Sequence, residues 1–257
     1  MSDVHCSKSS QGVLQPIFAQ VADRADVLVL CGDLTDYGLP EEARVLAREL
    51  AGERIPVVAV LGNHDFESGK EGEVRSILVD AGVHVLDGES HEVLGVGFAG
   101  TKGFAGGFGT ATLGAWGEAT IKQFVNEAVH EALKLETALA RLRTTPRVAL
   151  LHYAPVRATV VGEPLEIFPF LGCGRLEEPM TRYPVAAVVH GHAHNGTMEG
   201  TTAAGAPVYN VAMPLLLKHS PHEIPARFFD VDTYVPEEST PAYSGPERRQ
   251  PTVDAQA

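Results

Sequence analysis

Cysteine is scarce in this chain. Its 257 residues include three cysteines, Cys6, Cys31 and Cys173, and no CxxC spacing. An odd number of scattered cysteines argues against a disulfide framework and favours a reducing compartment. Cys31 directly precedes a glycine–aspartate pair, and we interpret it as a small buried residue and not as a nucleophile.

Long apolar runs and positive charge are also lacking. No run approaches the roughly 20 residues that a membrane-spanning helix needs. No charged region followed by an apolar one opens the chain as in a signal peptide, so we expect a cytoplasmic protein without a membrane partner. Lys and Arg number 20 against 33 Asp and Glu, a formal net charge of −13. Such a surface disfavours duplex nucleic acid. A small phosphorylated substrate is compatible with it, because divalent cations reverse the local field.

What the sequence does contain is an alternation of apolar runs and helical patterns, which predicts an α/β fold. Strands are predicted at 26–31, 56–61, 148–151, 185–189, 208–211 and 227–231, and helices at 40–50, 71–80 and 116–143. A hairpin is predicted from strands 83–86 and 91–98 around the turn Asp87-Gly88. The glycine-rich stretch 100–114 and the stretch 153–179 are predicted to be long loops, which in compact domains are usually functional or disordered. We expect one domain over 1–233 and a disordered tail over 234–257, which is rich in Pro, Glu, Ser, Arg and Gln.

Five short motifs carry Asp, Asn or His, and four of them come directly after an apolar run. In chain order they are Asp3-Val4-His5, Gly32-Asp33-Leu34-Thr35-Asp36, Gly62-Asn63-His64-Asp65, Leu151-His152-Tyr153 and Gly191-His192-Ala193-His194. Because the carboxyl ends of parallel strands share one sheet edge, where ligands bind, we expect the motifs to converge. Carboxylate, carboxamide and imidazole donors suit Mn, Fe or Zn better than thiophilic ions. The motifs therefore predict a centre for divalent metal ions.

Each of these residues alone has a plainer interpretation. An isolated Asp33 is typical of a helix cap or turn, an isolated Asn63 of a turn, and an isolated His192 or His194 of a loop. Their occurrence together favours metal ligation for all four. Asp36 has no ligand role in this scheme, and we interpret it as the cap of the helix that follows Gly38.

Three further polar residues have less specific settings. His190 lies on an apolar strand and is interpreted as a satisfied core histidine or a support for the ligands. Arg175 in the second long loop is a candidate for binding a substrate phosphate, and a surface or ion-pairing role fits it equally well. Lys102 in the glycine-rich loop is a weaker candidate of the same kind.

With these five motifs in this order over about residues 1–213, the chain resembles the calcineurin-like metallophosphoesterase superfamily. Within it, the resemblance is to bacterial phosphoesterases related to cyclic-nucleotide phosphodiesterases. It implies a four-layer α-β-β-α sandwich with two mixed sheets. It also implies two divalent metal ions, the first held by Asp3, His5, Asp33 and His194 and the second by Asp33, Asn63, His152 and His192. Asp33 would bridge the two ions, His64 would lie beside them, and Asp65 would orient His64.

The implied activity is hydrolysis of a phosphate ester, a small phosphodiester or phosphomonoester. Two cations about 3.5–4 Å apart would lower the pKa of a bridging water, and the hydroxide would attack phosphorus. His64 would protonate the leaving oxygen. A non-catalytic scaffold for a protein partner and a nuclease are the competing functions. Scaffold relatives usually lose His64 or several ligands, which are present here, and the acidic surface disfavours a nuclease. The sequence specifies neither the substrate, the native metals nor the oligomeric state.

The start of the chain departs from the family pattern. Only Met1 and Ser2 precede Asp3, whereas relatives have a central strand before their Asp-x-His. Without that N-terminal strand, buried backbone groups of its neighbours would lack partners, at about 1–3 kcal/mol each. We therefore expect the natural start to lie upstream, with about five to eight apolar residues before Ser2.

Overall fold

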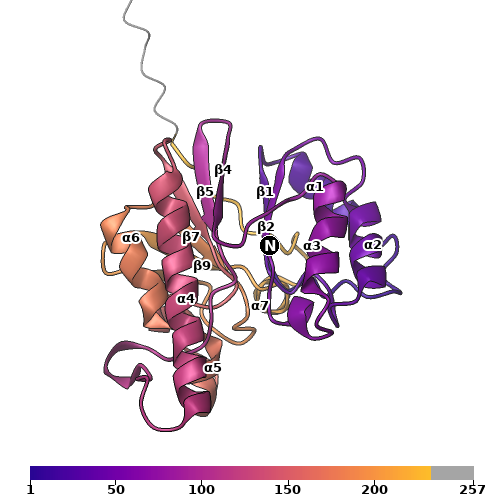
Figure 1. Ribbon diagram of the computed structural model, residues 1–257. Helices are drawn as coiled ribbons and strands as arrows, with labels where there is room; N and C mark the ends of the chain where they lie inside the picture. Colours follow the sequence, from indigo (N-terminus) through magenta and orange to yellow (C-terminus); the bar gives the residue numbers. More distant parts are fainter. Residues whose placement is uncertain (233–257) are drawn as a thin grey trace, which may run out of the picture.

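Two β-sheets face each other between two layers of helices in the computed structural model, which describes residues 1–232 (Figure 1). The first sheet has the order β1-β2-β3, with β1 at Leu28–Cys31, β2 at Val57–Val60 and β3 at His84–Val85. The second has the order β4-β5-β6-β7-β9-β8, with β4 at Glu89–Val93, β5 at Val96–Gly100, β6 at Arg147–Leu150, β7 at Ala187–His190, β8 at Glu199–Thr201 and β9 at Pro207–Asn210. The predicted α-β-β-α sandwich is confirmed. The second sheet is mixed as expected, whereas the first is parallel throughout its described strands.

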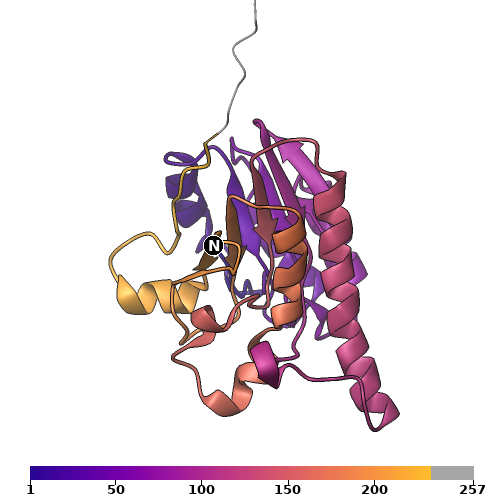
Figure 2. The same cartoon turned by 90° about the vertical axis from the view of Figure 1, so that its left-hand side faces the viewer.

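Three apolar layers hold these elements together. The middle layer lies between the sheets, where Val58 and Val60 of β2 pack with Phe98 of β5 and Leu150 of β6. One outer layer lies between the first sheet and α1 (Gln15–Ala22), α2 (Pro40–Glu49) and α3 (Glu71–Asp80). The other lies between the second sheet and α4 (Ala119–Arg141) and α6 (Glu178–Arg182). Figure 2 shows the long helix α4 beside the shorter α6 on this outer face. The sheets are thus buried on both faces, which explains why their central strands read as continuous apolar runs.

The helices of the first half begin as their sequences suggest, with one exception. Pro40 stands in the first turn of α2 and acidic residues follow it, a favourable arrangement at a helix N-terminus. The cap predicted for Asp36 is wrong, because α2 has no such side-chain cap. Instead, Glu42 reaches back and accepts hydrogen bonds from the backbone N–H groups of Tyr37 and Leu39, at 2.9 and 3.3 Å.

The predicted hairpin around Asp87-Gly88 is also wrong. β3 pairs in parallel with β2 in the first sheet, and β4 pairs in antiparallel fashion with β5 in the second. The hairpin turn lies at Leu94-Gly95, and both of these residues have positive φ. Asp87-Gly88 therefore belongs to the segment that connects one sheet to the other. Its residue types favour a turn, but they do not tell a hairpin turn from a connection between sheets.

The remaining elements complete the second half. They are α5 (Phe168–Leu171), α7 (Met213–His219) and short 3₁₀ turns at Gly109–Ala111, Arg157–Val160, Leu165–Ile167 and Gly174–Glu177. The strand predicted at 227–231 does not form. Its Phe229 packs on Tyr209 of β9 at 5.1 Å between ring centroids, and residues 226–232 instead line a groove of about 840 Å³ beside β1. Strand β8 was not predicted, because Glu199-Gly200-Thr201 has no apolar run.

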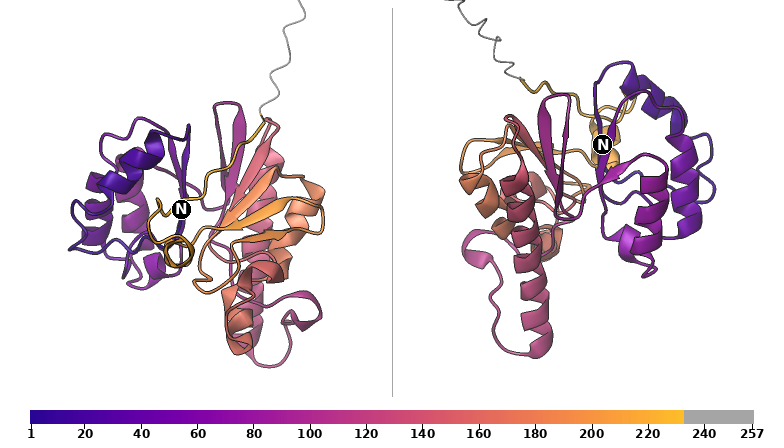
Figure 3. Two further views of the ribbon diagram at one scale, coloured as in Figure 1. Left: turned by 180° about the vertical axis from the view of Figure 1, so that it is seen from behind. Right: turned by 45° about the horizontal axis from the view of Figure 1, so that its top comes forward.

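The first residues of the chain lie between the two halves of the molecule (Figure 3). The Met1 amine donates a hydrogen bond to the Val29 carbonyl at 3.0 Å, and the Cys31 N–H donates to the Met1 carbonyl at 2.9 Å. Ser2 forms an isolated bridge with Ala212, so this segment lies between β1 and the residues that follow β9 without being a strand. The strand expected upstream of Ser2 stays a prediction, as does the domain limit at 233. The tail 234–257 lies outside the described residues. No helix within residues 1–232 is long and apolar enough to cross a membrane.

Candidate metal centre

Four of the five motifs follow directly on the carboxyl ends of strands. Asp33 comes after β1, Asn63 after β2, His152 after β6 and His192 after β7. The first two strands belong to one sheet and the last two to the other. Side chains from both sheets therefore meet at one end of the sandwich, as the sequence predicted.

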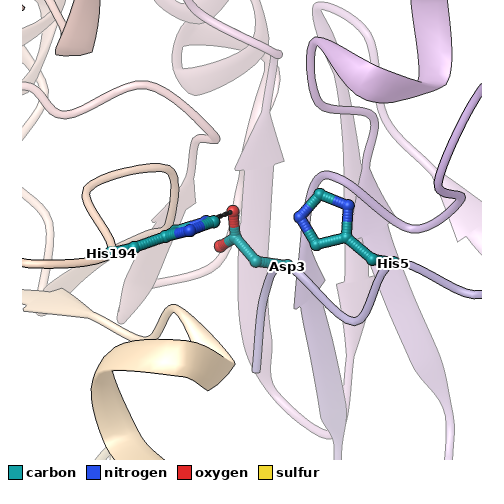
Figure 4. Close-up of side chains that lie close together, drawn as sticks. All are labelled: Asp3, His5 and His194. Atoms are coloured by element: carbon teal, nitrogen blue, oxygen red, sulfur yellow. Dashed lines mark hydrogen bonds and ion pairs between the residues drawn. The ribbon is translucent and has the colours of Figure 1, made fainter. Parts of the chain in front are cut away.

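A first cluster consists of Asp3, His5 and His194. One possible ligand atom from each lies within 4.8 Å of the others. The His194 Nε2 atom is 2.8 Å from Oδ1 of the buried Asp3 carboxylate. Figure 4 shows the two imidazole rings on either side of this carboxylate. Residues separated by almost the whole described chain thus form one donor set of hard and borderline ligands.

A second cluster consists of Asp33, His152 and His192, again with ligand atoms within 4.8 Å of one another. His152 Nε2 lies 3.3 Å from Asp33 Oδ1 and 2.9 Å from the Asn63 carboxamide oxygen, which adds a fourth donor. The other ring nitrogen, Nδ1, is 3.0 Å from the Cys31 carbonyl. This backbone contact fixes the imidazole so that Nε2 faces the cluster.

Asp33 is the residue that joins the clusters. Its Oδ1 faces His152, and its Oδ2 lies 3.9 Å from His5 Nε2 of the first cluster. A third possible ligand group, made of His5, Asp33 and His64, overlaps the other two. One buried carboxylate with an oxygen toward each cluster is the arrangement expected of a bridging ligand.

The backbone at the site is strained. Five non-glycine residues within 1–232 have positive φ, and four of them are candidate ligands: Asp3 at 56°, His5 at 42°, Asp33 at 48° and His192 at 69°. Such conformations are uncommon outside glycine and concentrate at functional sites. The backbone of Gly62 also packs closely against Asp33. A Cβ atom at this position would collide with the Asp33 backbone nitrogen and carboxylate.

His64 and Asp65 do not form the predicted pair. His64 Nδ1 is held 2.7 Å from the carbonyl of Asp36. Asp65 is fully buried, and its carboxylate accepts the backbone N–H groups of Leu34, Thr35 and Gly62 at 3.1, 2.8 and 2.8 Å. Asp65 therefore ties the loop after β1 to the loop after β2, and the orienting group of His64 is a carbonyl that no side-chain pattern reveals.

The charges of the site are strongly coupled. Burial works to raise the pKa of Asp33, but the neighbouring His152 holds it well below its usual range. Burial works to lower the pKa of His152, but Asp33 raises it to about 9. Burial lowers the pKa of His192 to about 4. A metal ion needs deprotonated imidazole, so its binding at His152 competes with a proton, whereas at His192 it does not.

Two other polar residues singled out in the sequence, Arg175 and His190, belong to neither cluster. Arg175 donates to the Leu113 carbonyl at 2.8 Å and lies 3.7 Å from the Cys173 sulfur, so its described contacts join the two long loops and do not face the clusters. Its role in substrate binding stays a prediction that these contacts do not support. His190 is fully buried and is satisfied by the Gly191 carbonyl and the Thr159 hydroxyl, both at 2.8 Å, as predicted for a core histidine.

Comparison with known proteins gives the following matches. A family model described as calcineurin-like phosphoesterase matches residues 1–196. Phosphopantetheinyl hydrolase from Mycobacterium tuberculosis has a similar fold, with a TM-score of 0.63, 16% sequence identity, and coverage of 92% of this chain and 97% of that one. A protein of Thermus thermophilus gives a TM-score of 0.49 at 14% identity, with 82% and 89% covered. No curated protein sequence matches significantly.

Proposed function

The chain belongs to the calcineurin-like phosphoesterase family, and from this premise we propose that it hydrolyses a phosphate ester, a small phosphodiester or phosphomonoester, with two divalent metal ions. The observation that carries the proposal is the sharing of Asp33 by two donor clusters. Each cluster contains the carboxylate and imidazole donors that Mn, Fe or Zn accept. Since many folds host unrelated activities, the proposed function follows from these side chains and not from the fold alone.

The residues present fit a pair of metal ions. We assign one ion to Asp3, His5, Asp33 and His194, and the other to Asp33, Asn63, His152 and His192. Nε2 of His5 lies 3.9 Å from Asp33 Oδ2, so this ring nitrogen faces the carboxylate that the two clusters share. An imidazole nitrogen directed at a buried carboxylate is a suitable donor for a borderline divalent ion held between the two groups.

Divalent ions at these positions would activate a water molecule and offset the charge of the phosphate group. The protein's own contribution to the chemistry is His64. Its Nδ1 is held by the Asp36 carbonyl, so a protonated ring has its Nε2–H left for the leaving oxygen of the ester. Asp65 contributes indirectly, because it fixes the spacing of the two loops that carry Asp33 and Asn63.

The competing functions fit less well. A scaffold has no use for four strained ligand positions, whose backbone conformations cost of order 1–3 kcal/mol each. A nuclease acting on polymers requires a basic path for the phosphate backbone, and the chain has a net charge of −13. The cytoplasm is the location we propose for the enzyme.

The direct test is hydrolysis of p-nitrophenyl phosphate and bis(p-nitrophenyl) phosphate by the purified protein, with its metal content measured first. We expect turnover of at least one ester, loss of turnover on chelation, and recovery on addition of Mn²⁺. A protein that holds close to two metal ions and hydrolyses neither ester, nor a wider panel of phosphate esters, would contradict the proposed function and favour the scaffold.

A further inference from the structure

Lys102 lies beside the metal centre but belongs to neither donor cluster. It follows β5, and its carbonyl accepts the backbone N–H groups of His152 and Tyr153, at 2.9 and 3.1 Å. Its backbone is therefore fixed to the segment that carries a proposed metal ligand. The side chain is 9% exposed, which is unusual for lysine.

Three aromatic rings surround the Lys102 ammonium group. Nζ lies 5.3, 4.9 and 5.4 Å from the ring centroids of Phe66, Phe104 and Tyr153. Phe66 comes two residues after His64, and the Tyr153 ring is 4.6 Å from the His192 ring. The Tyr153 ring thus lies between the Lys102 ammonium and the imidazole of His192, a proposed ligand. Phe66 places the ammonium on the side of the site that also contains His64.

The ammonium group lacks an acidic partner. Its one described hydrogen bond goes to the Gly103 carbonyl at 2.9 Å, and no carboxylate of residues 1–232 forms an ion pair with it. The nearby buried carboxylate of Glu131 is already occupied by the Thr101 hydroxyl, the Gly103 N–H and Lys134, at 2.5, 2.8 and 2.8 Å. A buried cation is normally paired, so this one has an unused capacity to bind an anion.

We propose that Lys102 binds a second anionic group of the substrate, such as a further phosphate, while the ester phosphate lies at the metal centre. The aromatic rings lower the water content around the ammonium, which strengthens its attraction for an anion. The preferred substrate class is then an ester whose leaving group carries its own negative charge. The proposal rests on the proposed phosphoesterase function.

The test uses two substrates with the same leaving oxygen, propyl phosphate and propane-1,3-diol bisphosphate. The quantity measured is the ratio of their kcat/KM values. We expect the parent protein to prefer the bisphosphate, mainly through KM. Lys102→Met and the near-isosteric Lys102→Gln should each reduce this ratio about 10- to 100-fold, the usual range for a hydrogen bond to a charged group. Lys102→Arg should retain most of the preference.

Lys122→Met is the matched control, because Lys122 is exposed on α4 and has no described contact with the site. It should leave the ratio unchanged. A parent protein that does not distinguish the two substrates would overturn the proposal, and so would Lys102 variants that lower both kcat/KM values equally. Turnover of the nitrophenyl esters, which lack a second anionic group, tests the proposed function separately.

Discussion

At the scale of single residues, the backbone conformation of the proposed ligands is as informative as their side chains. Asp3, His5, Asp33 and His192 all have positive φ. Asp and His tolerate this conformation better than most residues, but not without cost. Contacts elsewhere in the fold have to offset this conformational free energy. One such contact is the Asp65 carboxylate, which accepts N–H groups from the loop after β1 and the loop after β2. We therefore expect the proposed ligands to be largely in position before a metal ion binds.

Replacing Asp33 tests the shared ligand. Asp33→Asn keeps the shape of the side chain but removes the charge that faces both clusters. We expect activity to fall to less than about a tenth of the parent value, the effect of losing about 1.4 kcal/mol or more of transition-state stabilisation. Bound metal should fall from two ions toward one or none. Assays of metal content and turnover check this, with the exposed Asp80→Asn as the control that should change neither.

Replacing His64 tests the proton donor. His64→Ala should lower kcat by about 10²–10⁴, the usual effect of a lost acid–base group. Metal content should change little, and the loss should be smaller for nitrophenyl esters, whose leaving groups need less protonation. The measurement compares alkyl and nitrophenyl esters in the variant and in His130→Ala, which alters an exposed histidine of α4. Loss of metal from the His64 variant would contradict its assignment as a proton donor.

The types of residue at the site were predictable, but their supporting contacts were not. Asp33, Asn63 and His192 follow apolar runs, so their shared location follows from strand topology. The role of Asp65 and the Asp36 carbonyl depends on how two separate loops pack, which no local pattern contains. Arg175 shows the same limit, because its partner, the Leu113 carbonyl, lies 62 residues away in the chain.

At the scale of secondary-structure elements, α1 is fixed by a residue of another helix. The buried carboxylate of Glu49, at the end of α2, accepts the N–H groups of Gly12, Leu14 and Gln15, at 2.6, 2.9 and 3.0 Å. Two of these donors lie at the start of α1, which has no side-chain cap of its own. Burial works to raise the pKa of Glu49, but these three hydrogen bonds lower it overall.

Replacing Glu49 should therefore loosen α1. Glu49→Gln should lower the free energy of unfolding by about 1–3 kcal/mol at neutral pH, because a buried site loses its charged acceptor. A pKa that is lower in the folded state gives stability above the usual glutamate range, and this stability is lost as the pH falls through the folded value. The difference between the parent and the variant should shrink in acid. Urea unfolding at about pH 7 and about pH 4 measures it, with exposed Glu73→Gln as the control.

The sequence predicted helices and strands correctly where its apolar residues recur with helical spacing or form a continuous run. The helix expected at 71–80 has those limits, and the helix expected at 40–50 ends one residue earlier. It failed at Asp87-Gly88, where the same turn residues serve a crossing between sheets. It also failed at 227–231, whose apolar residues pack on β9 and a groove without joining a strand ladder. In both cases tertiary position, and not local preference, decides the structure.

At the scale of the whole molecule, the proposed metal ions join the two sheets. Asp33 and Asn63 follow strands of the first sheet, and His152 and His192 follow strands of the second. Mn²⁺ at about 100 times its Kd should add about 2.7 kcal/mol to the stability of the metal-free protein, or roughly 5–11 °C in Tm. Thermal unfolding at several Mn²⁺ concentrations measures this. Asp33→Asn should show a smaller shift, and an unchanged Tm in the parent protein would contradict the assignment.

The contact between Asp3 and His194 also has a consequence for the synthesis of the protein. These residues are 191 positions apart in the chain, yet their side chains lie 2.8 Å from each other. A ribosome that adds about 5–20 residues per second needs roughly 10–40 s to pass from one codon to the other. Throughout that interval, the growing chain exposes Asp3 and His5 without their partner. The first cluster is therefore completed late in translation. A chain terminated before His192 lacks part of both clusters. Only chains that extend beyond residue 194 can contain both complete donor sets.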